Sequence, residues 1–275
     1  MDISGWHTLR VGTGDEVILV VDFSAEASRA VAGFDDLVQL LPDRYTVRAP
    51  SRAAWADVPG GVVGPEAQLA SWLATADDLG PEVLAVLGYC AGCRLAAAFA
   101  DRIAAPTPPA TIFFDPLPVV PQTLWYEFVK AVTPLAPGLG QDVVDRAAEQ
   151  AGAQTDTTAN LDELARWLST SYADLASRAC EEIGIETEFA EQLISRLSEY
   201  LRYLTIAAAT PPVPGPAPAL VLRSREPVPA ELWEHADARQ LDVPRAELLA
   251  SQEAADLVTQ VLAGRELAAP ETVEP

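Results

Sequence analysis

The sequence predicts an α/β fold in which a mostly parallel central sheet carries helices on both faces and an inserted helical lid. Over residues 6–114, short apolar runs typical of strands alternate with segments of helical periodicity. This alternation is typical of a sheet covered on both sides. Over residues 121–210 only helical patterns occur, and strand-like runs return near Leu220. The helical stretch therefore interrupts the sheet.

Each predicted element follows from a local pattern. The helix expected over 26–41 has apolar residues at Val31, Phe34, Leu37 and Leu40, the spacing of one helix face. The first strand is expected to be antiparallel and the rest mostly parallel. The predicted strands span 6–11, 17–23, 45–49, 83–87, 111–114, 220–223 and 239–243. The other predicted helices span 69–79, 94–103, 124–132, 161–175, 189–208 and 250–262.

These patterns set the expected domain boundaries. Residues 1–120 and 211–267 form the α/β core, residues 121–210 form the lid, and residues 268–275 are expected to be a flexible tail. A proline-rich link over 210–218 returns the chain from the lid to the core.

Composition limits the partners and the setting of the protein. The formal net charge of −22 at pH 7 disfavours binding to nucleic acid and to anionic membrane surfaces. Three cysteines, an odd number, do not suggest a disulfide framework. We find no leader-like pattern and no apolar run long enough to span a bilayer, so we expect a soluble, cytoplasmic protein. The oligomeric state is left open.

One stretch carries the clearest chemical signal. The apolar run 83–87 leads into Gly88-Tyr89-Cys90-Ala91-Gly92, and a helix-forming segment follows at once. Strand, tight turn and helix with a nucleophile at the apex make up the nucleophile elbow of the α/β-hydrolases, here with cysteine in place of serine. We expect Cys90 to be the nucleophile, with its thiolate favoured by the dipole of the following helix. The alternatives are a buried structural cysteine and a redox C-x-x-C pair with Cys93.

A second candidate, Asp115, follows the strand predicted next to the strand of the elbow. Functional groups collect beyond the carboxyl ends of parallel strands, so Asp115 is the candidate acid. Its alternative role is that of a turn or cap residue before Pro116. The oxyanion hole is expected from the backbone N–H groups of Ala91 and Ala25, the latter in the loop after the strand 17–23.

The third member of a triad has no evident candidate. A histidine is expected after the last strand, but the segment 244–249 contains none, and the chain has only His7 and His235. His235 precedes the last strand and is expected near the opposite edge of the sheet. Glu247 lies near the expected place and could be a carboxylate base if burial and a nearby Asp115 raise its pKa. Alternatively, it is a glutamate favoured at a helix N-terminus.

These motifs resemble the stand-alone thioesterases of polyketide and nonribosomal peptide pathways over nearly the whole chain. The matching segments are Phe23-Ser-Ala-Glu-Ala-Ser at the family's Phe-Pro-x-Ala-Gly-Gly loop, Phe34 with Leu40-Leu41-Pro42, Gly88-Tyr-Cys-Ala-Gly at Gly-x-Ser-x-Gly, Asp115, and Trp233 with Leu241-Asp-Val-Pro. In the family the last run leads to Gly-Asp-His, and here the histidine is absent. A cysteine elbow followed by an aspartate is similar to the trans-acting Dieckmann cyclases, which use Cys, Asp and His.

The resemblance implies a function and a partner. Cys90 would be the acylated nucleophile and Asp115 the orienting acid, and the partner would be an acyl or peptidyl carrier protein with a phosphopantetheine thioester. The carried polyketide or peptide would move to Cys90 and leave by intramolecular, Dieckmann-type cyclisation, with no cofactor and no metal. Two alternatives stay open: a type II editing thioesterase that hydrolyses acyl thioesters, and a non-catalytic protein of the same fold that binds an acyl chain or a pathway protein.

Overall fold

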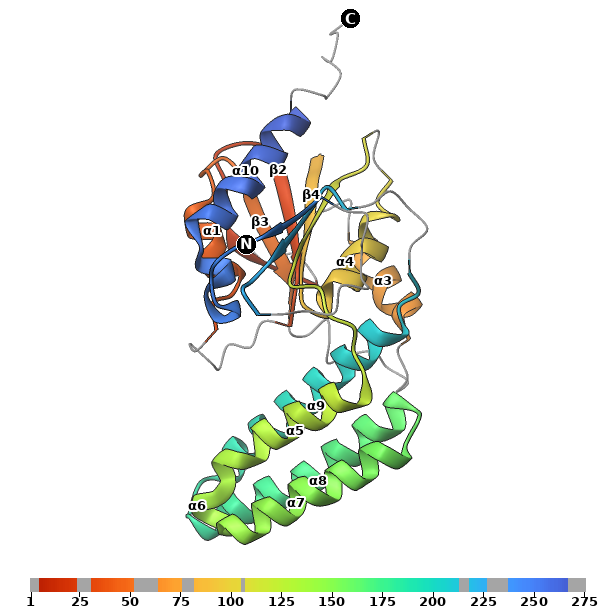
Figure 1. Ribbon diagram of the computed structural model, residues 1–275, viewed down its shortest axis with the longest axis vertical. Coiled ribbons are helices and arrows are strands. Elements are labelled where there is room, and N and C mark those ends of the chain that lie inside the picture. The colour runs from red at the N-terminus through yellow and green to blue at the C-terminus, as the bar shows by residue number, and fades with distance from the viewer. Residues whose placement is uncertain are drawn as a thin grey trace, which may run out of the picture. The chain divides into compact units, whose positions relative to one another are not determined.

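The computed structural model describes residues 5–23, 31–51, 64–75, 82–104, 107–212, 218–226 and 237–266. The chain divides into two compact units, one made of Met1–Pro118 with Ala209–Pro275 and the other of Val119–Ala208. The first contains the sheet and its covering helices, and the second is helical (Figure 1). The segment predicted as a lid, residues 121–210, includes nearly all the residues of the second unit.

Seven strands form one sheet within the residues described, in the order β1-β3-β2-β4-β5-β6-β7. They are β1 (Trp6–Arg10), β2 (Glu16–Val21), β3 (Thr46–Pro50), β4 (Glu82–Tyr89), β5 (Ala110–Phe114), β6 (Leu220–Arg223) and β7 (Ala238–Gln240). β1 pairs antiparallel with β3, and all the other pairs of neighbours are parallel. The predicted mostly parallel sheet is confirmed. Its central strands β2 and β4 are the continuous apolar runs that burial on both faces requires.

Helices cover both faces of this sheet (Figure 1). They are α1 (Phe34–Leu40), α3 (Pro65–Leu73), α4 (Gly92–Ala100), the 3₁₀ helix η3 (Arg245–Ala250) and α10 (Gln252–Glu266). On one face, α1, η3 and α10 share an apolar core with alternate strand residues such as Ile18, Leu87 and Phe114. On the other face, α4 packs on β2, β4 and β5. α3 lies beside α4, with the rings of Trp72 and Phe99 5.5 Å apart.

Several elements differ from the prediction. α1 begins at Phe34 rather than near residue 26, because the extended Gly33 precedes it and donates its N–H to the Asp36 carboxylate at 2.9 Å; residues 24–30 lie outside the described part. α3 begins earlier than expected, at Pro65, a residue favoured at the first position of a helix. β7 is shorter than its predicted strand. The helix α7, within residues 121–210, was not predicted separately because its apolar stripe consists mostly of alanine.

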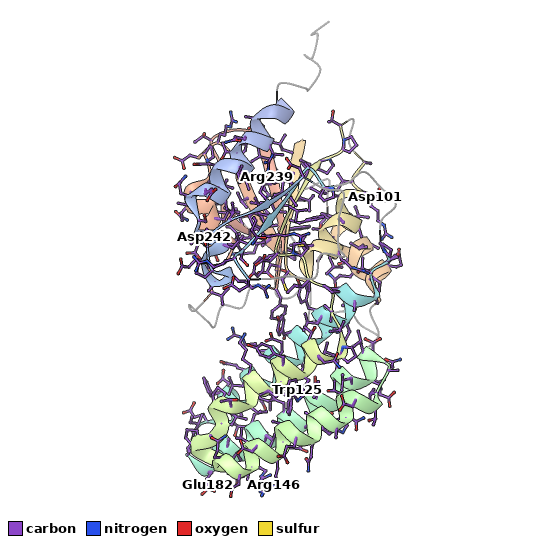
Figure 2. The ribbon with its side chains drawn as sticks, viewed as in Figure 1. Asp101, Trp125, Arg146, Glu182, Arg239 and Asp242 are labelled. Carbon is purple, nitrogen blue, oxygen red and sulfur yellow. The ribbon has the colours of Figure 1, made fainter. Side chains whose placement is uncertain are left out.

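The helical unit has its own core. Its helices are α5 (Pro121–Val132), η2 (Thr133–Leu135), α6 (Ala136–Leu139), α7 (Gln141–Thr157), α8 (Leu161–Glu182) and α9 (Thr187–Ala209). α5 packs against α7 and α8, and Leu124, Phe128 and Leu164 are fully buried. The indole Nε1 of Trp125 donates to the carbonyl of Ala148 on α7 at 3.1 Å (Figure 2). Among the helices described in either unit, none is both long and apolar enough to cross a membrane.

Gly88 allows α4 to lie close to β4. A Cβ atom at position 88 would be 2.6 Å from the Cys93 Cα and 2.9 Å from the Ala96 Cβ, well inside the usual separation of nonbonded carbons. The helix can approach the strand this closely only because residue 88 has no side chain. The first glycine of the Gly-x-Cys-x-Gly motif therefore sets the spacing of the two elements that flank Cys90.

Gly88→Ala should lower the free energy of unfolding by about 2 kcal/mol, a typical cost of overpacking, because strand and helix must separate. Urea denaturation followed by circular dichroism measures the change. Gly264→Ala on α10 is the matched control, since a Cβ there meets nothing within 4 Å and alanine favours a helix. A Gly88→Ala variant as stable as the wild type would contradict the close approach.

Candidate active site

Cys90 occupies the sharp turn between β4 and α4, as the sequence predicted. Its φ is +52°, a conformation unfavourable for a residue with a side chain. Hydrogen bonds hold it there. The Cys90 N–H donates to the Phe114 carbonyl at 2.9 Å, and the Cys90 carbonyl accepts the N–H groups of Cys93 at 3.3 Å and Leu117 at 3.4 Å. The residue stays partly exposed to solvent.

Asp115 follows β5, the neighbour of β4, and is fully buried. It too has a positive φ, of +42°, and its N–H donates to the carbonyl of Leu222 on β6 at 2.9 Å. Tyr89 and Phe114, which precede Cys90 and Asp115, are partners in the register of the two strands. The two strained residues therefore follow matched positions at the same edge of the sheet.

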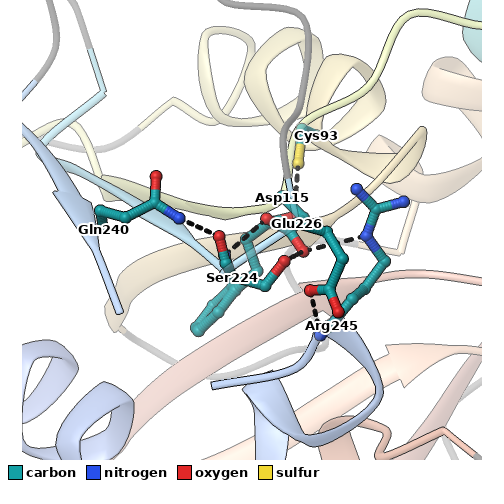
Figure 3. Close-up of polar contacts among 7 residues, drawn as sticks. Cys93, Asp115, Ser224, Glu226, Gln240 and Arg245 are labelled. Carbon is teal, nitrogen blue, oxygen red and sulfur yellow. Dashed lines mark hydrogen bonds and ion pairs between the residues drawn. The ribbon is translucent and has the colours of Figure 1, made fainter. Parts of the chain in front are cut away.

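Two side chains hold the Asp115 carboxylate (Figure 3). Ser224, directly after β6, donates its N–H to Oδ1 at 2.8 Å and its hydroxyl to Oδ2 at 2.5 Å. Arg245 donates its Nε–H to Oδ2 at 3.1 Å. The side-chain amide of Gln240 in turn donates to the Ser224 carbonyl. The buried charge is thus both paired and hydrogen-bonded, as burial requires.

Arg245 stands in the segment where a histidine was sought. It opens η3, its side chain is one-third exposed (33%), and its backbone N–H donates to the Glu226 carboxylate at 2.7 Å. A guanidinium stays protonated at any ordinary pH. Arg245 therefore cannot accept the proton that a triad histidine takes from its nucleophile. The triad positions hold cysteine, aspartate and a permanent cation.

Sequence reasoning missed Ser224, Arg245 and Asp22. Arg245 lies in the segment 244–249, where the triad pattern predicts a histidine, and an arginine does not fit that pattern because it has no exchangeable proton near neutral pH. Ser224 and Asp22 directly follow β6 and β2, as Asp115 follows β5. Their positions after parallel strands were the signal that could have identified them.

The other predicted site residues are placed as follows. Glu247 is exposed in η3, and its backbone N–H donates to the Pro244 carbonyl at 2.9 Å; its role as a base stays a prediction. His7 is exposed on β1, and β3 and β2 separate that strand from β4. Ala25 and His235 lie outside the described residues.

The ionisation of Cys90 differs from the prediction. Burial, and after it the charge of Asp22, raise the pKa of the thiol to about 12. A hydrogen bond from the Ala91 N–H, at the start of α4, and the charge of Arg245 act in the opposite direction but are outweighed. The expectation of a thiolate at rest is therefore wrong, because desolvation exceeds the effect of the helix N-terminus. Cys90 is a neutral thiol at pH 7.

Cys93 is a buried structural thiol. Its Sγ lies 3.7 Å from the Phe114 carbonyl oxygen, to which it donates, and burial raises its pKa well above the ordinary value. A redox C-x-x-C pair needs a thiolate at one of its two cysteines, and burial opposes that at both. In the described part of the chain, no group of three or more His, Cys, Asp or Glu side chains could hold a metal ion.

Comparison with solved structures identifies the fold. The Vlm2 thioesterase domain, with genetically encoded 2,3-diaminopropionic acid and bound with a dodecadepsipeptide, matches with a TM-score of 0.54 at 14% identity, over 94% of this chain and 97% of that one. A haloalkane dehalogenase loop variant from Bradyrhizobium elkanii matches with a TM-score of 0.50 at 17% identity, over 96% and 93%. The chain has the α/β-hydrolase fold.

A third likeness is to part of a much larger protein. A four-domain nonribosomal peptide synthetase bound to AMP and glycine matches with a TM-score of 0.51 at 13% identity. The match covers 98% of this chain, which spans 20% of the length of that one. No protein-family model matches the sequence, and comparison with curated proteins finds no match.

The pairing of Arg245 with Asp115 predicts a loss of stability when the cation is removed. Arg245→Met should lower the free energy of unfolding by about 2 kcal/mol, because a buried carboxylate loses its partner. The double variant Arg245→Met/Asp115→Asn should recover part of this loss, since no charge is then left unpaired. Urea denaturation at pH 7 measures all three proteins.

The control is Arg225→Met. Arg225 pairs with Asp242 (labelled in Figure 2) at 2.7 Å, but the two side chains are 59% and 92% exposed. We expect a change below about 1 kcal/mol there. A loss at Arg245 no larger than that at Arg225 would contradict the assignment of a buried pair.

Proposed function

We propose that this protein is a thioesterase-like acyl-transfer enzyme. Cys90 takes a polyketide or peptide chain from a carrier-protein thioester, and the chain leaves by intramolecular cyclisation. The observation that carries the proposal is the left-handed backbone of Cys90 at the strand–helix turn, which presents the sulfur beyond the end of the sheet in the manner of a nucleophile elbow. The resemblance of the motifs to thioesterases and Dieckmann cyclases supports it.

The backbone around Cys90 suits attack on a thioester carbonyl. The Ala91 N–H lies at the sulfur and is the donor that would stabilise negative charge on the carbonyl oxygen during attack. The N–H of Ala25 is proposed as the second donor. Transfer of an acyl group between two thiols is close to neutral in energy, so it places modest demands on the site.

Arg245 favours cyclisation over hydrolysis as the mode of release. In a hydrolytic triad the histidine activates the attacking water, and a guanidinium at that position cannot do so. A polyketide–amino acid chain carries an acidic carbon between two carbonyl groups, which gives up its proton far more readily than water does. Such a chain supplies its own nucleophile: the carbon loses its proton to solvent and bonds to the thioester carbonyl carbon. The bond from that carbon to the Cys90 sulfur breaks, and the departing thiolate takes up a proton.

We propose the helical unit as a lid over this reaction. It is inserted between β5 and β6, the two strands that Asp115 and Ser224 follow. The segment leading out of the sheet unit is bonded to the elbow through the Leu117 N–H, and the returning segment accepts a hydrogen bond at the Thr210 carbonyl from Arg94 on α4 at 3.1 Å. A lid attached at these points would exclude water and favour cyclisation.

A covalent adduct tests the nucleophile. Wild-type protein incubated with the octanoyl thioester of N-acetylcysteamine should gain one octanoyl group in intact-protein mass spectrometry. Cys90→Ala should gain none, whereas Cys93→Ala should still gain one because Cys93 is buried. An unmodified wild type would overturn the proposal and support the non-catalytic binding alternative, which the arginine in the histidine position favours.

The released product tests the mode of release. With the N-acetylcysteamine thioester of an N-acetoacetyl amino acid, we expect the cyclic product, which is lighter than the free acid by one water. Liquid chromatography with mass spectrometry separates the two, and a protein-free sample corrects for spontaneous closure. The hydrolytic alternative predicts mainly free acid, lost in Glu247→Gln if Glu247 is the base; that result would replace cyclisation with editing.

A further inference from the structure

Asp22 is a carboxylate beside the elbow that lies outside the three triad positions. It follows β2 directly, and β2 is the neighbour of β4 on the side away from β5. Val21 and Gly88 are partners in the register of β2 and β4. By the same register Asp22 falls beside Tyr89, one residue before Cys90. Carboxylates thus follow the strands on both sides of the elbow strand, Asp22 on one side and Asp115 on the other.

The two carboxylates differ in what holds them. Both oxygens of Asp115 accept hydrogen bonds, from Ser224 and Arg245, and one of them faces a permanent cation. Both oxygens of Asp115 are thus already engaged with donors from the protein. Asp22 accepts a hydrogen bond from the Phe23 N–H, and burial raises its pKa to about 7. Asp22 therefore has a pKa in the range where it can exchange a proton near neutral pH.

Electrostatic coupling agrees with the strand register. Among the charged groups that affect the Cys90 thiol, Asp22 has the strongest effect, ahead of Arg245 and Asp115. Because the interaction of two charges weakens with distance, this order fits a carboxylate on the adjoining strand. Among the described residues, Asp22 also raises the pKa of Tyr89 on β4 and of Cys93 on α4. Asp115 after β5 and Arg245 of η3 act on the same Tyr89 and Cys90 groups, and Arg48 lies on β3, the other neighbour of β2.

We propose that Asp22 accepts the proton of the Cys90 thiol during acyl transfer and so performs the task of the absent histidine. This inference rests on the proposed function. As the Cys90 sulfur bonds to the thioester carbonyl carbon, the thiol proton moves to the Asp22 carboxylate. As the bond from that carbon to the carrier sulfur breaks, the proton moves from Asp22 to the departing thiolate. Asp22 ends the exchange ionised, as it began.

Asp22→Asn separates this role from a mere effect of charge. Loss of the base should slow acylation of Cys90 by the octanoyl thioester about a hundredfold at pH 7.5, the lower end of the usual range for general-base catalysis. Loss of the negative charge should lower the pKa of Cys90 and so speed its alkylation by iodoacetamide at pH 8.5. The two rates, both followed by intact-protein mass spectrometry, should move in opposite directions.

The pH profile gives a second readout. Asp22 accepts a proton only when it is ionised, so wild-type acylation should rise tenfold per pH unit below about 7 and level off above it. In Asp22→Asn the rate should instead keep rising to pH 10. Asp101→Asn is the control, because Asp101 is the exposed residue that follows α4 (Figure 2); it should leave both rates unchanged.

Each other outcome overturns the inference in a recognisable way. If Asp22→Asn speeds both reactions, Asp22 is only a neighbouring charge. If neither rate changes, Asp22 does not act on Cys90 at all. If wild-type Cys90 takes no acyl group, the proposed function fails and the inference fails with it. A damaged fold would show itself by alkylation of the buried Cys93 and Cys180 as well.

Discussion

The arrangement at the carboxyl edge of the sheet depends on the buried pairing of Asp115 with Ser224 and Arg245. A carboxylate with no exposed surface is tolerated only when its charge is matched and its oxygens are bonded. This requirement ties the end of β5 to the end of β6 and to η3. Phe114, the residue before Asp115, also accepts the Cys90 N–H. The end of β5 thus holds both the elbow, through Phe114, and the buried ion pair beside it, through Asp115.

A permanent cation at that position changes what the elbow can do. A histidine there would exchange protons with the nucleophile, but Arg245 only lowers the pKa of the Cys90 thiol, and burial together with Asp22 outweighs it. On the side of β4 that faces β5, Asp115 and Arg245 therefore stabilise the fold, and the Arg245 guanidinium provides a charge that does not change with pH. Proton exchange near neutral pH is left to the side that faces β2, where Asp22 titrates. In the mechanism that we propose, the roles usually joined in one triad are divided between β5 and β2, the two strands that flank β4.

The sequence predicted much of this architecture because buried parallel strands consist of continuous apolar runs, and because Gly88 allows the close approach of helix and strand at the elbow. It failed where the outcome depends on tertiary contacts. Arg245 was in the right segment, but nothing local says that its side chain reaches Asp115, 130 positions away in sequence. The ionisation of Cys90 was misjudged because the helix N-terminus is visible in the sequence, whereas the desolvation that outweighs it comes from the packed neighbours of the elbow.

A cysteine suits a site with this kind of base better than a serine would. Because the pKa of the thiol is raised to about 12 and that of Asp22 only to about 7, complete proton transfer from thiol to carboxylate before attack would be strongly uphill. The proton must therefore move as the bond to the carbonyl carbon forms. An alcohol is a much weaker acid than a thiol, so the same carboxylate would face a larger gap with serine. In thiol exchange the departing group is again a thiolate that needs a proton, and Asp22 has just received one. A weak base is then sufficient, because the proton that Asp22 takes from Cys90 is passed on to the departing thiolate.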